Sequence, residues 1–254
     1  MLPAERKRKI VELVTARDGC AVDDLATELD FSKATIRRDL RQLEDDGLIE
    51  RSHGGAVPVT AVGREQSYGQ RDVQRLEQKA AIAEVAVEQI RPGQVVFFDA
   101  GTTTMQVGKR APKDGSFLAV TNSPLLAMEL TSDENEVKLT GGTLRRRTRA
   151  LVGPSATGFM ERMNFDLLFL GTNAIDSDGG LSTPNEDEAL VKEVMIERAA
   201  RVVLVADGSK VGKRSFIEFA DLEGVDVFIT DRSLTRAEQE TFDAADVAVL
   251  ETPE

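Results

Sequence analysis

The sequence contains very few of the residues that form disulfides or bind transition metals. Cys20 is the only cysteine and His53 the only histidine among the 254 residues. No disulfide can form within the chain, and no cysteine cluster can hold zinc. A histidine-rich metal site or a Ser-His-Asp triad elsewhere in the fold is excluded as well. We therefore expect neither a metal site nor a cofactor.

Long apolar runs are also missing. No stretch approaches the roughly 20 consecutive apolar residues that cross a bilayer. The N-terminus opens with basic residues, Arg6 to Lys9, within an amphipathic pattern, whereas a signal peptide would continue into an apolar segment. We therefore expect a cytoplasmic protein with no membrane partner. The length of the chain is typical of a protein with two domains.

Positive charge is scarce over most of the chain, and its distribution is uneven. The net charge is −12, but residues 1–57 hold 10 Lys+Arg against 12 Asp+Glu, while the rest holds 22 against 32. An acidic chain is an unusual partner for nucleic acid, so only the clustered basic residues of the first segment favour DNA. With 22 arginines and 10 lysines, the composition resembles that of proteins from salt-loving archaea; the alternative is an ordinary acidic cytoplasmic protein.

Three short helices and a hairpin are predicted in the first 57 residues. Apolar spacing predicts helices over residues 4–16 and 22–29, and a third helix that begins after Ser32 as its N-cap. The third helix has apolar residues on one side and basic residues on the others. This is the helix-turn-helix plan, in which the last helix enters the major groove. Residues 48–57 predict a β-hairpin, the wing.

Basic and hydroxyl side chains of the third helix and the wing are the candidates for contacts with double-stranded DNA. They are Ser32, Lys33, Thr35, Arg37, Arg38, Arg41, Arg51 and His53. Exposed arginine and lysine can pair with guanine edges or with phosphates. The alternative is a solvated charged face, in which Asp39 and the acidic residues 44–46 neutralise the arginines.

Apolar strands alternate with helices after a linker at residues 58–71. The predicted strands are 95–99, 117–121, 137–140, 167–171, 202–206, 227–230 and 247–250. The predicted helices are 73–91, 103–111, 124–132, 155–163, 186–200 and 235–244. Such alternation predicts an α/β domain over residues 72–254, with a mostly parallel sheet and helices on both faces. Its ligand site is expected at the carboxyl ends of the strands.

Small and polar residues gather at these predicted strand ends, with cations nearby. The candidates are Asp99, Gly101, Thr102, Thr103, Thr104, Thr121, Asn122, Gly141, Gly142, Arg145, Asp207 and Lys210. At residues 101–104 a glycine and three hydroxyls lead into a helix, whose free N–H groups suit a phosphate. The alternative for each loop is turn chemistry and helix capping.

Two sequence motifs within residues 1–57 resemble those of a known family. Residues 32–40 read Ser-Lys-Ala-Thr-Ile-Arg-Arg-Asp-Leu, and residues 51–56 read Arg-Ser-His-Gly-Gly-Ala. With Leu43-Glu44 and Gly47 between them, they resemble the DeoR family of bacterial and archaeal sugar-catabolism regulators. The resemblance implies that Ser32, Thr35, Arg37 and Arg38 fall in the recognition region, and that His53 with two glycines lies in the wing.

The second segment, roughly residues 65–252, resembles the DeoR-family sensor domain, which is similar to ribose-5-phosphate isomerase and related phosphosugar-binding folds. The resemblance implies that the Gly-Thr-Thr-Thr loop holds a phosphate and that the Gly141-Gly142 turn with Arg145 belongs to the site. It also implies that Lys79, Asp207 and Lys210 take part in the effector response. The family usually has Gly-Ala-Asp-Gly after the fourth strand, where residues 171–174 read Gly-Thr-Asn-Ala. This departure leaves the sugar open.

These expectations describe a DNA-binding repressor of sugar catabolic genes, relieved by a sugar-phosphate effector and active as a homodimer or homotetramer. One alternative is a sugar-phosphate isomerase or deaminase, which needs a carboxylate base beside the substrate. The loop after the fourth strand has no carboxylate before Asp176, and the second domain has no histidine, so we expect no enzyme. The other alternative is a DNA-binding assembly protein without a metabolite effector.

Overall fold

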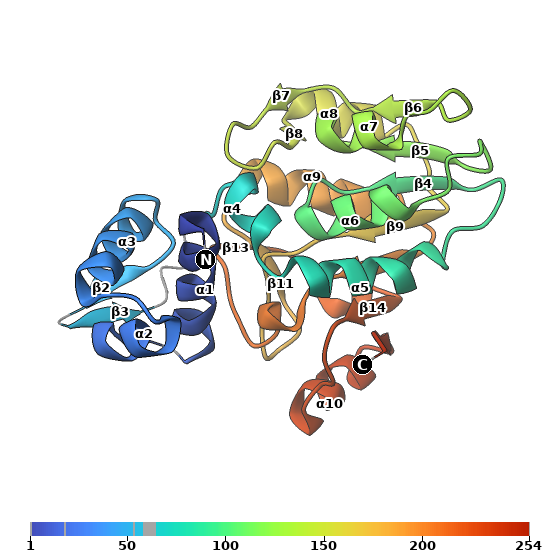
Figure 1. Ribbon diagram of the computed structural model, residues 1–254. Coiled ribbons are helices and arrows are strands. Elements are labelled where there is room, and N and C mark those ends of the chain that lie inside the picture. The colour runs from blue at the N-terminus through green and yellow to red at the C-terminus, as the bar shows by residue number, and fades with distance from the viewer. Residues whose placement is uncertain (1, 18, 53, 58–64, 254) are drawn as a thin grey trace. The chain divides into compact units, whose positions relative to one another are not determined.

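The chain divides into two units, Met1–Gln74 and Arg75–Glu254. Their folds are seen in a computed structural model (Figure 1), which describes residues 2–17, 19–52, 54–57 and 65–253. His53, one of the predicted DNA contacts, and residues 58–64 of the predicted linker lie outside the described residues. The division falls after Gln74, a little later than the predicted start of the second domain at residue 72.

The first unit contains a three-helix bundle and a small antiparallel sheet with the strand order β1-β3-β2. Its elements are α1 (Pro3–Ala16), β1 (Cys20–Ala21), α2 (Val22–Leu29), α3 (Lys33–Asp45), β2 (Glu50–Ser52) and β3 (Gly55–Val57). Strand β1 was not predicted, and it pairs Cys20 with Ala56. Gly55 permits this pairing, since a Cβ there would lie 2.2 Å from the carbonyl oxygen of Cys20.

A short helix, α4 (Tyr68–Val73), begins within the last part of the predicted linker. A capping box starts this helix: the Ser67 hydroxyl accepts from the Gln70 backbone N–H, and the Gln70 side chain accepts from the Ser67 N–H. Reciprocal capping satisfies two backbone donors that a short helix otherwise leaves without partners. The Ser-x-x-Gln spacing was readable in the sequence.

The second unit is built on a seven-stranded sheet, ordered β15-β14-β12-β9-β4-β5-β6, in which every neighbouring pair is parallel. The strands are β4 (Val95–Phe98), β5 (Leu118–Thr121), β6 (Val137–Leu139), β9 (Leu167–Leu170), β12 (Val202–Val205), β14 (Val227–Thr230) and β15 (Ala248–Glu251). The predicted parallel α/β sheet is thereby confirmed. The central strands β4, β9 and β12 are unbroken apolar runs because helices cover both faces, whereas the edge strands β6 and β15 are less buried and carry Lys138 and Glu251.

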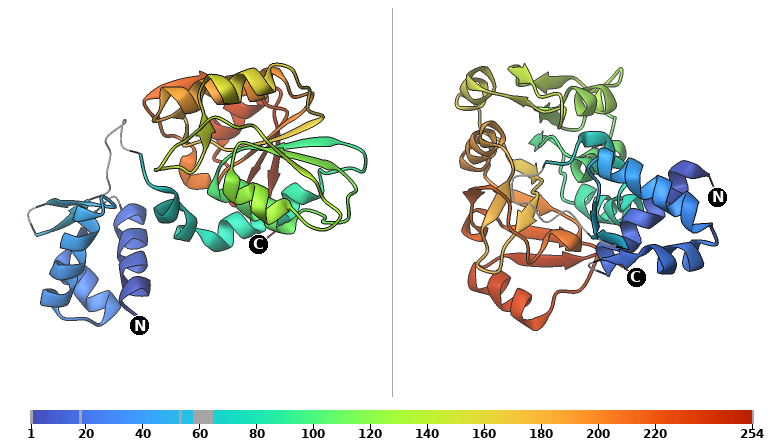
Figure 2. Two further views of the ribbon diagram at one scale, coloured as in Figure 1. Left: turned by 90° about the horizontal axis from the view of Figure 1, so that it is seen from above. Right: turned by 90° about the vertical axis from the view of Figure 1, so that its left-hand side faces the viewer.

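Helices α5, α6 and α7 cover one face of this sheet, and α8 and α9 cover the other (Figure 2). Their bounds are α5 (Leu76–Val87), α6 (Thr102–Arg110), α7 (Pro124–Leu130), α8 (Pro154–Met160), α9 (Glu186–Glu197) and α10 (Arg236–Ala244). The predicted helix 73–91 is shorter than expected, since it begins at Leu76 and ends at Val87. No described helix is long and apolar enough to cross a membrane.

Short antiparallel strands, none of them predicted, lie outside the parallel sheet. A hairpin joins β7 (Thr143–Leu144) to β8 (Leu151–Val152). A second sheet has the order β10-β11-β13, from β10 (Ala174–Ile175), β11 (Leu181–Thr183) and β13 (Ile217–Ala220). Three of these strands, β7, β8 and β10, have only two residues, which is too short for a periodic pattern in the sequence.

Candidate functional site

The exposed basic side of α3 is the main feature of the first unit. Ile36, Leu40 and Leu43 are buried in the core, whereas Arg37, Arg38 and Arg41 are exposed. Within the part of the chain that the structure describes, no carboxylate forms an ion pair with these three arginines. Their guanidinium groups are therefore available to a polyanion.

Asp39 does not neutralise these arginines, which corrects one part of the charged-face alternative. It is buried and faces α1, where Arg6 donates from Nε to Oδ2 over 2.5 Å and from Nη2 to Oδ1 over 3.2 Å. The guanidinium of Arg6 also lies 4.4 Å from the centre of the Phe31 ring. This pair fixes α3 on α1 and leaves the opposite side of α3 exposed.

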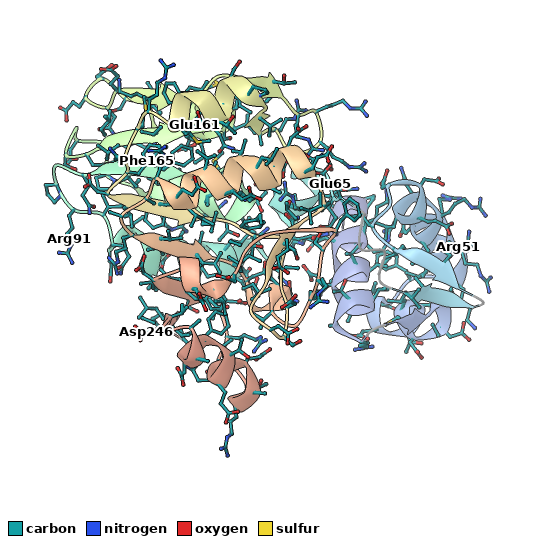
Figure 3. All side chains as sticks on the ribbon, turned by 180° about the vertical axis from the view of Figure 1, so that it is seen from behind. Arg51, Glu65, Arg91, Glu161, Phe165 and Asp246 are labelled. Carbon is teal, nitrogen blue, oxygen red and sulfur yellow. The ribbon has the colours of Figure 1, made fainter. Side chains whose placement is uncertain are left out.

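The other predicted DNA contacts that the structure describes are engaged within the unit. Ser32 caps α3 by accepting from the Thr35 N–H, and the two hydroxyls lie 2.9 Å apart. Lys33 pairs with Asp23 at 2.7 Å. Arg51, labelled on the wing in Figure 3, pairs with Glu44 at 3.4 Å. These exposed pairs are weak and can exchange for phosphate contacts.

The second unit brings the predicted phosphate loop, residues 101–104, to the carboxyl end of β4. Gly101 precedes α6, whose first N–H groups have no partner within the helix. Thr102 and Thr104 are buried. Among the described residues, no atom hydrogen-bonds to Oγ1 of Thr104. A Cβ at Gly101 would lie 2.9 Å from this oxygen, so the hydroxyl lies directly beside the glycine backbone.

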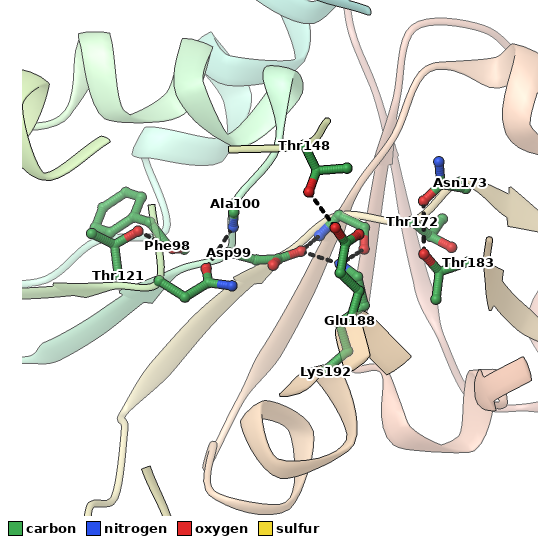
Figure 4. Close-up of polar contacts among 12 residues, drawn as sticks. Phe98, Asp99, Ala100, Thr121, Thr148, Thr172, Asn173, Thr183, Glu188 and Lys192 are labelled. Carbon is green, nitrogen blue, oxygen red and sulfur yellow. Dashed lines mark hydrogen bonds and ion pairs between the residues drawn. The ribbon is translucent and has the colours of Figure 1, made fainter. Parts of the chain in front are cut away.

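The end of β5 lies beside this loop, because Phe98 pairs with Thr121 across the two strands. Thr121 donates its hydroxyl to the carbonyl of Phe98 over 2.7 Å, and Asn122 accepts from the Ala100 N–H over 2.8 Å. Both side chains are buried, and their hydrogen bonds hold the loop in place. Figure 4 labels Thr121 beside Phe98 and Ala100. The sequence predicted these residues to lie in the effector site, and in the structure their hydrogen bonds position the loop.

Asp99 pairs with Lys192, a residue that the sequence did not indicate as part of the site. Lys192 of α9 donates to Asp99 Oδ2 and, over 2.8 Å, to the carbonyl of Gly171, whose own N–H donates to Asp99 over 3.0 Å. Burial raises the pKa of Asp99, and the ammonium of Lys192 acts in the opposite direction. Both side chains are buried. We call residues 99–104, 121–122 and 171–173 with Lys192 the strand-end site (Figure 4).

Glu188, which also lies on α9, holds the β7–β8 hairpin over the strand ends. Glu188 accepts from Arg145 and from Thr148 of this hairpin. The backbone N–H of Leu151 donates to the carbonyl of Asn122 over 2.7 Å, so the hairpin reaches the end of β5. The predicted Arg145 is thus tied to α9.

The predicted glycines Gly141 and Gly142 form the turn into this hairpin. Gly142 has φ +106°, and a Cβ there would lie 2.5 Å from the carbonyl oxygen of Val152. Gly141, with φ +75°, also adopts the left-handed conformation that favours glycine. These glycines shape the turn that carries Arg145.

Lys79, Asp207 and Lys210 lie together at the end of β12. Asp207 caps the short helix Gly208–Lys210 by accepting from the Ser209 N–H over 3.2 Å, and the charges of Lys210 and Lys79 act on its carboxylate. Asp207 and Lys79 are both buried. In the described part of the chain, no group of three or more His, Cys, Asp or Glu side chains is placed to hold a metal ion.

Lys192 and Glu188 are candidate site residues that the sequence did not indicate. A signal was present, because both occupy buried positions of α9, next to Ala189 and Val191. A charged residue within a buried helix stripe requires a partner. The partners come from β4 and the hairpin, far away in the sequence.

Known families match both units. Residues 6–62 match the DeoR-like helix-turn-helix domain, and residues 74–232 match the DeoR C terminal sensor domain. The HTH-type transcriptional regulator GlpR of Haloferax volcanii is 67% identical over 251 residues, which are 99% of this chain and 98% of that protein. The transcriptional repressor AccR of Agrobacterium fabrum is 38% identical over 229 residues, 89% of each chain.

Among solved structures, ribose 5-phosphate isomerase A from Methanocaldococcus jannaschii aligns with 54% of this chain and 55% of that chain, at 14% identity and a TM-score of 0.40. The family assignment depends on the two domain matches and on the full-length relative. The chain therefore belongs to the DeoR family of helix-turn-helix transcriptional regulators.

Proposed function

We propose that this protein represses sugar catabolic genes by binding an operator through its first unit, and that a phosphorylated sugar at the strand-end site relieves the repression. The name of the Agrobacterium fabrum relative, a transcriptional repressor, supports the direction of regulation. The protein acts in the cytoplasm as a homodimer or homotetramer, since one small reader makes few contacts and such regulators bind repeated half-sites.

The buried hydroxyl of Thr104 is the observation that carries the sensing role. A buried polar group without a partner is costly, and it is uncommon outside functional sites. Thr104 is fully buried at the start of α6, and no described atom hydrogen-bonds to its Oγ1. A phosphate on the loop 101–104 would accept from this hydroxyl and from the free N–H groups of the helix.

The pairing of Asp99 supports binding rather than catalysis. Oδ2 of Asp99 accepts from Lys192 and from the Gly171 N–H. A general base must instead approach a proton of the substrate. The Asp99–Lys192 pair therefore positions the loops after β4 and β9 for the sugar.

The test combines DNA binding with ligand binding in the full chain. Fluorescence anisotropy on a promoter fragment is measured while hexose phosphates or the free hexoses are added. We expect a phosphorylated sugar to weaken DNA binding by about 10- to 100-fold, the range of ordinary allosteric coupling. The same compound should raise Tm in a concentration-dependent way, whereas the free sugar should not.

A matched pair of variants locates the phosphate. Thr104→Val removes the hydroxyl at the start of α6, and Thr230→Val removes another buried hydroxyl without a described partner, at the end of β14. We expect Thr104→Val to weaken ligand binding about tenfold and to leave DNA affinity unchanged, with no effect of Thr230→Val. Wild-type ligand affinity in Thr104→Val would place the phosphate elsewhere. If no sugar phosphate changes either DNA affinity or Tm, the sensing role is wrong.

A further inference from the structure

Strand β6 is one of the two edges of the seven-stranded sheet (Figure 1), and in that sheet it pairs with β5 alone. The Thr140 N–H, just after β6, donates to the carbonyl of Thr121 over 3.1 Å. Because backbone groups alternate in direction along a strand, those of Val137 and Leu139 point away from β5. Such an edge offers backbone donors and acceptors to another strand.

Exposed apolar side chains lie beside this edge, on the face of the sheet that α7 covers. Leu139 pairs in register with Thr121, and the alternate residue Val120 belongs to the core that includes residues of α8 and α9, so Leu139 faces α7. Leu139 and Leu125 of α7 are each 39% exposed, and Met128 of α7 is 81% exposed. Helix α7 contacts β6, so these side chains form one apolar surface, of the kind that marks an interaction site.

The opposite edge of the sheet, β15, differs from β6. Among the described residues 225–253, no large apolar side chain is exposed. Helix α10, which contacts β15, instead exposes charged residues such as Arg236, Glu240 and Asp243. Of the two edges, β6 is therefore the one that combines outward backbone groups with an apolar surface.

The charges at β6 are complementary to themselves. Glu136, just before the strand, and Lys138 flank Val137 and share the face opposite Leu139. Within the part of the chain that the structure describes, neither of them forms an ion pair. Antiparallel pairing of two copies about a two-fold axis at Val137 places Glu136 of each copy opposite Lys138 of the other. The two Val137 residues then exchange both backbone hydrogen bonds, and two opposite-charge pairs form across the strands.

This pairing also brings the two copies of α7 together. A two-fold axis perpendicular to the sheet keeps each face continuous, so α7 of one copy lies beside α7 of the other. Leu125, Met128 and Leu139 are the exposed apolar residues at that junction. Their burial matters, because a stable interface covers about 1,200–2,000 Å² in total and a three-residue strand supplies little of this area.

We propose that two copies of this chain associate through β6, paired antiparallel, with the two α7 helices packed across the two-fold axis. Each copy contributes the same residues, which makes the interface isologous and closes it at two chains. This inference rests on the proposed function and deepens it, because it names the surface that joins two DNA-binding units in one assembly.

Charge exchange tests the pairing in the full chain, by sedimentation velocity at several protein concentrations. Glu136→Lys and Lys138→Glu each place like charges opposite one another twice, so we expect either change to weaken the association by at least about tenfold. The double variant Glu136→Lys/Lys138→Glu restores opposite charges and should return to within about threefold of the wild type. Asp243→Lys, an exposed charge reversal beside the other edge, should have no effect.

A second pair of variants tests the packing of α7. Met128→Glu places a charge in the apolar junction of both copies, so we expect it to weaken the association by at least about tenfold. Leu190→Glu makes the same change at an exposed leucine of α9 and is the matched control. It should leave the association unchanged, and Tm measures whether each variant is folded.

The outcomes separate this inference from the proposed function. Wild-type association in both single charge variants and in Met128→Glu would place the contact between copies elsewhere and overturn the inference, with repression and sensing intact. Weakening without recovery in the double variant would overturn the antiparallel pairing. Loss of DNA affinity at unchanged mass would assign β6 to DNA and overturn the interface. A wild type that sediments as one chain at every concentration would contradict the interface and the proposed homo-oligomer together, while the anisotropy titrations with sugar phosphates still decide the sensing role.

Discussion

Arg6 of α1 and Asp39 of α3 form a buried ion pair, with Nε 2.5 Å from Oδ2 and side chains only 10% and 5% exposed. Arg6 belongs to the basic N-terminal run, and Asp39 is the acidic residue between the arginines of α3. Two opposite charges that the sequence suggests are exposed to solvent therefore pair with each other inside the first unit. Arg37, Arg38 and Arg41 form the basic surface of α3, and Asp39 does not neutralise their charge.

Asp39→Asn should therefore destabilise the protein strongly. The change leaves the guanidinium of Arg6 buried without its countercharge, and breaking a buried pair in this way costs about 3–5 kcal/mol. Equilibrium denaturation of the full chain measures the loss. Asp23→Asn is the matched control, because it breaks the exposed pair with Lys33 and should cost less than about 1 kcal/mol. Similar effects of the two variants would contradict the structural role of Arg6–Asp39.

Arg38→Ala should weaken operator binding by at least about tenfold and leave the fold intact. Its side chain is exposed on α3, and an arginine that contacts a base edge contributes about 1–3 kcal/mol to binding. DNA titrations followed by anisotropy, with Tm as the test of folding, provide the measurement. Arg8→Ala, an exposed arginine of α1 paired with Glu12, is the control. Wild-type binding by folded Arg38→Ala would exclude this face of α3 as the reading surface.

Lys192→Met should destabilise the second unit in a manner that depends on pH. Burial raises the pKa of Asp99 above its value in the unfolded chain, and loss of the ammonium raises it further. A raised pKa contributes stability below the unfolded value, and this stability is lost as pH rises through the folded value. The deficit relative to the wild type should therefore be larger at about pH 8 than at about pH 5.

Adding Asp99→Asn to Lys192→Met supplies the control for that prediction. The double variant has no carboxylate to titrate at this position, so its deficit should be nearly constant across the same pH range. Denaturant titrations at both pH values give the free energies of unfolding. The role of Asp99 would be disproved by a deficit in Lys192→Met that is equal at the two pH values.

Glu238 should add acid-sensitive stability at the start of α10. The hydrogen bond from Arg232 lowers the pKa of Glu238 to about 2, against the effect of burial, and the Thr235 N–H contributes in the same direction. A lowered pKa gives stability that is present above the unfolded value of 4.5 and is lost as pH falls toward 2. Glu238→Gln should thus lose about 1 kcal/mol at neutral pH, discounted for the partial exposure of Arg232, and less near about pH 3.

Glu240→Gln provides the comparison on the same helix. Glu240 pairs with Arg236 four residues away, but both side chains are largely exposed. Such a pair contributes about 0.3–0.5 kcal/mol at most. Thermal unfolding of both variants at several pH values distinguishes the two carboxylates. If the two variants show the same pH dependence, the hydrogen bond from Arg232 does not stabilise the ionised form of Glu238.

The sequence by itself determined the elements that depend on local patterns. The central strands of the parallel sheet, β4, β9 and β12, are continuous apolar runs, and the helices between the strands follow the helical period. The order of these elements predicted the α/β fold. Ser32 was predicted as the N-cap of α3 because a hydroxyl before a helix accepts from its first turn, and it accepts from the Thr35 N–H. The motif at residues 32–40 indicated the DeoR family, which the domain matches confirm.

The tertiary structure decided which charged residues face inward. The sequence indicated Asp39 only as an acidic residue among the arginines of α3, and Lys192 only as a residue of a helix. In the fold, each is buried against a partner more than 30 residues away in the sequence. The short strands β10 and β11 pair with each other, and β11 also pairs with β13, which lies far along the chain. A sequence pattern indicates which apolar side chains are buried, because the hydrophobic effect that buries them is not directional. The partner of a buried charge depends on which distant segments the folded chain brings together.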